Sequence, residues 1–125
     1  MILGTGIDLV YVPRVRRLAD RWGPAGLRRI FSEEELEYSF SRRDPALRLA
    51  GRFAAKEALV KALGGLPEGA RLREAWVTCP PGAPPRLMLV GAWQEELDRR
   101  GVTRVHLSLS HGGDYAVGQV LLEGS

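Results

Sequence analysis

The sequence predicts a single α+β domain, residues 1–125, in which an antiparallel sheet packs with helices. A chain of 125 residues is long enough to bury a substantial core in one domain. Helical patterns fill its middle, and strand-like segments fill its start and its second half. The resulting order of elements, β-α-α-α-β-β-α-β-β, is typical of an α+β fold with an antiparallel sheet.

The first strand and the first helix are predicted from residue types. Residues 2–12, ILGTGIDLVYV, are rich in the apolar and aromatic residues that favour strands. Pro13 ends this strand and suits the first turn of a helix, so residues 14–21 are expected to form a short basic helix. Glycine and proline within residues 23–26 break that helix.

Capping signals define the next two helices. Ser32 is followed by three glutamates, which predicts an N-cap with a capping-box glutamate and a helix that begins there. Asp44-Pro45 is expected to cap a longer helix that runs to Leu63, where Gly64-Gly65 ends it.

The second half of the chain is expected to be rich in strands. These strands are predicted at residues 73–79, 86–90, 105–110 and 115–122. The segment PPGAPP, residues 80–85, predicts a turn, and residues 91–100 predict a helix that ends at Gly101. His-Gly-Gly-Asp, residues 111–114, is a strong signal for a hairpin between the last two strands.

Composition and charge narrow the class of protein. The net charge is +3 and the pI is near 9.5, which mildly favours an acidic partner. The single cysteine, Cys79, excludes an intrachain disulfide and suits a reducing compartment. No apolar run approaches the ~18 residues of a membrane span, and the first ten residues lack the basic region of a signal peptide. We therefore expect a cytoplasmic protein without a membrane partner.

Both lysines of the chain lie in one stretch, RFAAKEALVKALG, although 16 of its 18 basic residues are arginine. On a helix, Glu57 and Lys61 fall one turn apart on one face, and the surrounding residues are apolar or small, which is typical of a buried helix. A buried charge is costly unless it is paired or bound to a ligand. One interpretation is an ordinary i,i+4 ion pair. The other is a ligand site, because a lysine ammonium is a compact charge that suits phosphate.

An aspartate lies inside an apolar strand at GTGIDLV, residues 4–10, although aspartate is depleted in strands. Alternation puts Asp8 on the same face as Gly4 and Gly6, which we expect to leave open space beside it. A carboxylate that faces open space suits a hard cation such as Mg²⁺. The alternative is an aspartate that accepts hydrogen bonds from backbone N–H groups at the end of the strand.

A third group of polar residues precedes the predicted hairpin. In HLSLSHGGDYA, residues 106–116, Ser108, Ser110 and His111 come before two glycines. Serine side chains and glycine amides are natural contacts for phosphate, whereas a lone histidine near a hairpin is more often structural than catalytic. Together the three stretches supply two carboxylates, lysines and a Ser-Gly-His turn, which are the parts of a metal-bridged phosphate site.

These stretches also stand in the order and at the separations of a known family. The sequence resembles holo-[acyl-carrier-protein] synthase, a family of 4′-phosphopantetheinyl transferases, over essentially the whole chain. The resemblance rests on GTGIDLV, RFAAKEALVKALG and LSLSH, and it implies the 4′-phosphopantetheinyl transferase fold. It also implies a Mg²⁺-dependent enzyme that moves 4′-phosphopantetheine from coenzyme A to a serine of apo acyl carrier protein and releases adenosine 3′,5′-bisphosphate.

The resemblance assigns residues to this reaction. Asp8 and Glu57 correspond to the Mg²⁺ ligands. The residues that it implies for coenzyme A are Arg52, Lys56, Lys61, Ser110 and His111, and those for catalysis are Glu57, Lys61 and His111. The base that deprotonates the acceptor serine stays open among Glu57, His111, Asp8 and a metal-bound water.

The resemblance further implies a homotrimer with active sites between subunits and an acidic carrier protein as partner. Arg14, Arg17 and Arg21 share one helix face, and Arg14 and Arg21 match family positions that contact the carrier. The alternative, which is more common for a group of arginines like this one, is a basic helix face that contacts only solvent.

Two positions depart from the wider family pattern. Val10 stands where larger relatives have a third carboxylate, which agrees with the short synthases, in which water completes the metal shell. Ala83 stands where a basic residue is frequent, and Arg86 is a nearby basic residue that could substitute for it.

Two other classes of function are alternatives to the transferase: a nucleic-acid-binding module and a phosphohydrolase. A basic nucleic-acid-binding module would need exposed aromatic residues or a groove-reading helix, and the chain has few aromatic residues and no known binding motif. A small Mg²⁺-dependent phosphohydrolase would release its product to water without a protein acceptor. We therefore expect no nucleic-acid partner.

Overall fold

The computed structural model describes residues 1–125, and its elements follow the predicted order. The strands are β1 (Ile2–Tyr11), β2 (Ala75–Thr78), β3 (Arg86–Leu89), β4 (Val102–Gly112) and β5 (Tyr115–Gly124). The helices are α1 (Val12–Leu27), α2 (Glu33–Phe40), α3 (Pro45–Leu63) and α4 (Ala92–Arg100), with a short 3₁₀ helix, η1 (Leu72–Glu74), before β2. The predicted α+β class with antiparallel strands is confirmed.

The helix ends follow the capping signals. At the start of α2, the Ser32 hydroxyl accepts a hydrogen bond from the Glu35 amide (3.2 Å), and the Glu35 carboxylate accepts one from the Ser32 amide (3.0 Å). Asp44 caps α3, and Gly64 ends it with a φ of 78°. The predicted end of α1 is too early, because the chain kinks at Gly23, where φ is 65°, and then continues as a helix.

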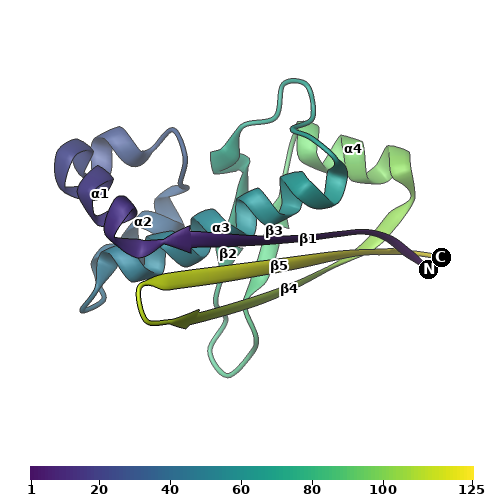
Figure 1. The fold of residues 1–125 in the computed structure, drawn as a ribbon. Helices are drawn as coiled ribbons and strands as arrows, with labels where there is room; N and C mark the ends of the chain where they lie inside the picture. Colours follow the sequence, from purple (N-terminus) through teal and green to yellow (C-terminus); the bar gives the residue numbers. More distant parts are fainter.

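The strands form two antiparallel sheets rather than the single sheet predicted. The larger sheet has the order β1-β5-β4, and the smaller one pairs β2 with β3. Figure 1 shows α3 lying along the larger sheet, with α1 and α2 toward one end, α4 toward the other, and the two termini side by side. Helix α3 is thus the centre of the molecule, and 12 of its 19 residues are buried.

Two clusters of apolar side chains hold α3 in place. The first joins its N-terminal half to α1 and α2 and includes Leu27, Phe31, Leu36 and Leu49. The second joins its C-terminal half to α4 and the sheets and includes Leu59, Trp93, Leu97 and Leu122. This burial agrees with the apolar pattern around the two lysines. None of the helices combines the length and the apolar character needed to cross a membrane.

Glycines on the inner face of the larger sheet let α3 approach its backbone closely. A Cβ atom built on Gly6 would lie 1.9 Å from the carbonyl oxygen of Ala58, and one on Gly118 would lie 2.7 Å from a backbone carbon of the same helix. The prediction that Gly4 and Gly6 leave open space beside Asp8 is therefore wrong, because the helix backbone fills that space. The glycines instead bring α3, and with it the side chains of the helix, directly to β1.

This close contact gives a stability prediction. Gly6→Ala pushes a methyl group into the backbone of α3, and we expect it to lower the free energy of unfolding by about 3 kcal/mol or to prevent folding. Gly51→Ala is the matched control, since Gly51 is also buried, on α3, but no other part of the chain lies within 4 Å of a Cβ built there. We expect this control to stabilise the protein by up to about 1 kcal/mol. Urea unfolding measures the free energy of unfolding of both variants. Equal losses in Gly6→Ala and Gly51→Ala would contradict the explanation that Gly6 is needed for the close approach of α3.

Candidate active site

Two carboxylates from different elements meet at one place on the molecule. Asp8 lies on the inner face of β1, and its side chain is only 16% exposed. Glu57 is half-buried on α3. Burial raises the pKa of Glu57, the negative charge of Asp8 raises it further, and the positive charge of Lys61 opposes both effects. The two carboxylates line one cavity, and their negative charges repel each other.

Lys61 completes this group of charges. Its Nζ atom donates hydrogen bonds to Oδ1 of Asp8 (2.9 Å) and to the backbone oxygen of Ile7 (3.1 Å). The i,i+4 ion pair with Glu57 that was considered from the sequence is absent, because Lys61 reaches across to β1 instead. The Lys61 side chain is 55% exposed, which leaves the ammonium accessible to a ligand.

A cavity of about 440 Å³ opens beside the two carboxylates. Its charged groups are Asp8, Glu57 and Arg14. The rest of its wall is largely apolar and includes Tyr11, Val15, Leu18, Ile30, Phe31 and Phe53. A few charged groups in an otherwise apolar cavity are typical of small-molecule sites.

A second, smaller pocket of about 200 Å³ brings together Arg52, Ser110 and His111. The guanidinium of Arg52 is almost fully buried, lies 4.3 Å from the centre of the Tyr38 ring, and donates a hydrogen bond to Sγ of Cys79 (3.1 Å). Its Nε atom is buried and has no hydrogen-bond partner. A buried cation with a free donor beside a serine and a histidine suits an anionic ligand.

The two pockets are separate within one chain. Strand β5 lies between β1 and β4, and the register aligns His111 with Ala116 and Ala116 with Val10. His111 therefore lies two strand spacings from β1, about 10 Å. The residues predicted from the sequence form two groups: Asp8, Glu57 and Lys61 in the first, and Arg52, Ser110 and His111 in the second.

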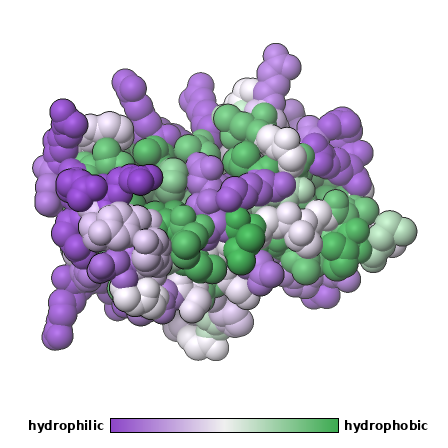
Figure 2. All heavy atoms as spheres, viewed as in Figure 1, coloured by the Kyte–Doolittle hydropathy of each residue, from purple (hydrophilic) through white to green (hydrophobic).

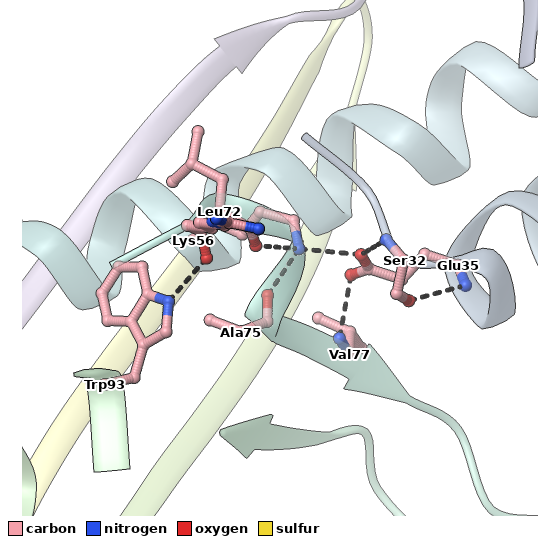
Figure 3. A network of polar contacts seen from close by, with 8 residues as sticks. Ser32, Glu35, Lys56, Leu72, Ala75, Val77 and Trp93 are labelled. Carbon is pink, nitrogen blue, oxygen red and sulfur yellow. Dashed lines mark hydrogen bonds and ion pairs between the residues drawn. The ribbon is translucent and has the colours of Figure 1, made fainter. Parts of the chain in front are cut away.

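Lys56 does not reach either pocket. Its side chain is fully buried, and Nζ donates to Oε1 of Glu35 (2.7 Å) and to the backbone oxygens of Leu72 (3.0 Å) and Ala75 (2.5 Å), as Figure 3 shows. The prediction that Lys56 binds coenzyme A is therefore wrong, because all three N–H groups of its ammonium have partners inside the protein. Burial lowers the pKa of Lys56, and the Glu35 carboxylate opposes this effect.

The two arginines expected to bind a carrier lie on α1 and are both exposed. Arg14 also lines the cavity beside Asp8 and Glu57, whereas Arg21 lines neither pocket. Their role toward a carrier stays a prediction.

Sequence reasoning missed three residues that shape these sites: Glu35, Tyr38 and Cys79. The capping box identifies Glu35 only as part of a helix cap, yet its carboxylate also holds Lys56. A signal for this pair exists, because a lysine on an apolar helix requires an acidic partner. Nothing local in the sequence points to Tyr38 or Cys79, which reach Arg52 only through the tertiary fold.

The pair of carboxylates suits a hard divalent cation. Mg²⁺ prefers oxygen ligands, and its sites use one or two protein carboxylates together with water and substrate phosphates. No third His, Cys, Asp or Glu side chain joins Asp8 and Glu57 to make a protein-only site. This agrees with Val10 at the position where larger relatives have a third carboxylate.

The fold, the two carboxylates and the basic residues of the pockets are typical of a small α+β protein that binds phosphate esters. The chain belongs to the 4′-phosphopantetheinyl transferase superfamily, whose family model matches residues 4–120. The family identified from the three sequence motifs is thereby confirmed.

Named relatives match the chain over nearly its whole length. A holo-[acyl-carrier-protein] synthase of Anaeromyxobacter dehalogenans (strain 2CP-C) is 47% identical over 130 residues, which cover 100% of this chain and 98% of the relative. The crystal structure of holo-[acyl-carrier-protein] synthase from Neisseria meningitidis is 35% identical and superposes with a TM-score of 0.88, covering 98% of this chain and 99% of that one. A holo-(acyl-carrier-protein) synthase from Bacillus anthracis str. Ames, solved in complex with CoA (3′,5′-ADP), is 32% identical with a TM-score of 0.80, covering 100% and 99%.

Proposed function

We propose that this chain transfers 4′-phosphopantetheine from coenzyme A to a serine hydroxyl of apo acyl carrier protein, with Mg²⁺ as its cofactor. The observation that carries the proposal is the meeting of Asp8, Glu57 and Lys61 beside one cavity. The synthase relatives named above support it over the full length of the chain. The cytoplasmic location and the absence of a nucleic-acid partner stay predictions.

Each residue of the first group has a separate task in this reaction. Asp8 and Glu57 hold the Mg²⁺, which when bound supplies positive charge to the pyrophosphate of coenzyme A. The ammonium of Lys61 has three N–H groups, of which Asp8 and Ile7 accept two. The third is free to donate to a phosphate oxygen, where negative charge develops as the bond to the transferred group breaks.

The second pocket suits another phosphate of coenzyme A. The buried Arg52 guanidinium has an unpartnered Nε atom, and Ser110 and His111 offer further donors in the same pocket. Tyr38 and Cys79, which line the same pocket, hold Arg52 in place, so its guanidinium is oriented before a ligand arrives. This preorganisation favours tight binding of an anion.

Glu57 is our first choice for the base that takes the proton of the acceptor serine. Its carboxylate lines the same cavity as Asp8, where the proposal brings the substrates together. His111 lies in the other pocket of the same chain, and Asp8 is already engaged by Lys61.

Mass spectrometry of apo acyl carrier protein incubated with the chain, coenzyme A and Mg²⁺ tests the proposal. We expect the carrier to gain one phosphopantetheine, and we expect no gain with EDTA or with a carrier whose acceptor serine is changed to alanine. Cleavage of coenzyme A without modification of the carrier would favour the phosphohydrolase. Salt-dependent binding of DNA or RNA together with an unmodified carrier would favour the nucleic-acid-binding module.

We also propose that the chain works as a homotrimer, assembled through the outer face of the larger sheet. This face exposes apolar side chains: Ile7 and Leu9 are each 60% exposed, and Tyr11 and Tyr115 contact each other beside them. Figure 2 shows hydrophobic side chains, interrupted by hydrophilic ones, in the band of surface that β1 and β5 occupy in Figure 1. An exposed apolar strip on a sheet is typical of a protein–protein interface, and a neighbouring copy there would bring its own pocket residues closer to Asp8.

Ile7→Asp tests this assembly. The change places a charge in the centre of the apolar strip, and we expect it to convert the oligomer to monomer and to lower transfer activity with it. Leu66→Asp is the matched control, because Leu66 is also exposed (53%) but follows α3, away from the sheet. Light scattering measures the molar mass. A wild-type chain that is fully active as a monomer would contradict the trimer.

Charge reversal on α1 tests the proposed docking of the acidic carrier. We expect Arg14→Glu combined with Arg21→Glu to lower kcat/KM for the carrier by at least about tenfold at low salt, because rim charges act on association rate. Binding of coenzyme A should change little in Arg21→Glu alone, because Arg21 lines neither pocket, whereas Arg14 lines the cavity beside the two carboxylates. The control is Arg99→Glu with Arg100→Glu on α4, which changes the net charge equally at the other end of the molecule. If affinity for coenzyme A falls as much as that for the carrier, the arginines of α1 have another role.

A further inference from the structure

A fully buried ion pair joins Lys56 to Glu35, and neither residue has a task in the proposed reaction. Both side chains are 0% exposed. Oε1 of Glu35 accepts hydrogen bonds from Lys56 and from the Ser32 amide, and Oε2 accepts one from the Val77 amide (2.9 Å). Figure 3 shows that the network ties α3 to α2 on one side and to the start of β2 on the other. Every charged atom of the pair therefore has a partner.

Stability alone is a weak reason for this arrangement. Taking two charges out of water costs several kcal/mol per ion, and well-packed apolar residues often replace such pairs without loss. Unlike an apolar side chain, a buried ammonium is held in one orientation, because its three N–H groups donate to three acceptors. Two of these acceptors are backbone oxygens at η1: Leu72 is its first residue, and Ala75 follows its last. That segment is itself held by Trp93, whose indole N–H donates to the backbone oxygen of Arg71 (2.7 Å).

On the side that faces the larger sheet, α3 is held by apolar packing and by Lys61, which donates to β1. There the helix backbone lies directly on Gly4, Gly6 and Gly118 of the sheet. These glycines set the separation between helix and sheet, but they provide no side chains that interlock with those of α3. The fully buried ion pair of α3, with its directional hydrogen bonds, lies on the side that faces α2 and β2.

Lys56 is bonded to Glu57 in the chain, so rotation of the helix moves both. Successive residues point about 100° apart around a helix, which lets Lys56 face the interior while Glu57 faces Asp8. Since side chains extend to about 6 Å from a helix axis, a rotation of about 20° would displace the Glu57 carboxylate by about 2 Å. A displacement of about 1 Å can cost 10²-fold in rate. Arg52, one turn earlier, adds only one hydrogen bond and one ring contact to this restraint.

We propose that the buried Lys56–Glu35 pair is a positioning element: it fixes the rotation of α3 and thereby aims Glu57 and Lys61 at Asp8. The inference rests on the proposed function, because it concerns the geometry of the proposed metal site. It distinguishes the two lysines of the chain. Lys61 contacts the substrate, and Lys56 acts only through its neighbour in sequence.

Metal binding measured apart from activity tests this role. The probe is Mn²⁺, titrated without coenzyme A and followed by electron paramagnetic resonance, at a temperature where circular dichroism finds every variant folded. We expect Lys56→Met to weaken Mn²⁺ binding by at least about tenfold, the usual effect of removing a group that orients a metal ligand. The Mg²⁺ concentration needed for half-maximal transfer should rise by the same factor.

Two further variants separate positioning from stability. Lys56→Met combined with Glu35→Gln removes both charges and should recover much of the melting temperature lost in the single variant, but it should still bind Mn²⁺ weakly. If Lys56→Met alone does not fold, the double variant can still be used to measure Mn²⁺ binding. Leu97→Ala is the control, because Leu97 lies on α4 and its truncation opens a cavity beneath that helix, in the core cluster that includes Trp93 and Leu122. It should lower the melting temperature with Mn²⁺ affinity unchanged.

The outcomes distinguish this inference from the proposed function. Wild-type Mn²⁺ affinity in both Lys56 variants would overturn the positioning role and leave the transferase assignment standing. Equal weakening in Leu97→Ala would also overturn it, since any loss of stability would then have the same effect. A wild-type chain that neither binds Mn²⁺ nor modifies the carrier would overturn the proposed function and this inference with it.

Discussion

Asp8→Asn and Glu57→Gln are each expected to lower the turnover of carrier modification by at least about 10²-fold while the fold survives. Each change keeps the size of the side chain and removes one negative charge from the pair proposed to hold Mg²⁺. Asp8 has an ion pair with the exposed Lys61, and such pairs contribute at most about 1 kcal/mol. Initial rates measured against Mg²⁺ concentration, with melting curves from the same samples, test the expectation.

A matched control for these variants is Glu33→Gln. Glu33 is an exposed carboxylate on α2, paired with Arg28 at 2.7 Å and outside both pockets. The same chemical change there should leave turnover and Mg²⁺ dependence at their wild-type values. Near-normal activity with unchanged Mg²⁺ dependence in Asp8→Asn and Glu57→Gln would remove these two residues from the metal site.

Glu57→Gln should also stabilise the metal-free protein near neutral pH. Burial and the charge of Asp8 raise the pKa of Glu57 in the folded chain, so the folded state favours its protonated form. The resulting stability is present at acidic pH and is lost as the pH rises through the folded-state pKa. The glutamine variant lacks this loss, and we expect its melting temperature in EDTA to exceed that of the wild type at neutral pH but not at acidic pH. A lower melting temperature at neutral pH would indicate that Glu57 has a structural role instead.

The local part of the fold could be predicted from the sequence because its signals are local. Ser32 with Glu35, and Asp44 with Gly64, mark helix ends through contacts within a few residues, and these positions hold in the structure. Residue types alone do not tell whether a helix resumes after a break, so the sequence predicts a helix end where the structure has only a kink at Gly23.

The sequence predicts which residues form the site better than it predicts their contacts and burial. Helical spacing places Glu57 and Lys61 on one face, but it cannot tell which of the two lysines is buried, since this depends on where α2 packs. In the structure α2 brings Glu35 to Lys56, which makes Lys56 the buried one. Alternation correctly places Asp8 on the same face as Gly4 and Gly6. It does not predict what packs against that face, which in the structure is the backbone of α3.

Lys61 is expected to act on the transition state. Negative charge grows on the bridging oxygen as the pyrophosphate bond breaks, and a fixed positive charge beside it stabilises the transition state more than the ground state. Lys61→Met should therefore lower kcat by at least about 10²-fold. Lys61→Arg should restore only part of the activity, because the planar guanidinium differs from an ammonium in size and in the geometry of its donors.

The contacts of Lys61 make the alternative easy to recognise. If Lys61 serves only as the ion-pair partner of Asp8, its 55% exposure limits the loss in Lys61→Met to at most about 1 kcal/mol of stability, and kcat per folded molecule should stay at the wild-type value. The measurement is kcat at saturating coenzyme A, carrier and Mg²⁺, corrected for the folded fraction, together with the melting temperature of the same samples. A large loss of kcat with an almost unchanged melting temperature supports the catalytic role, whereas a lower melting temperature with unchanged kcat would leave Lys61 as a structural partner of Asp8.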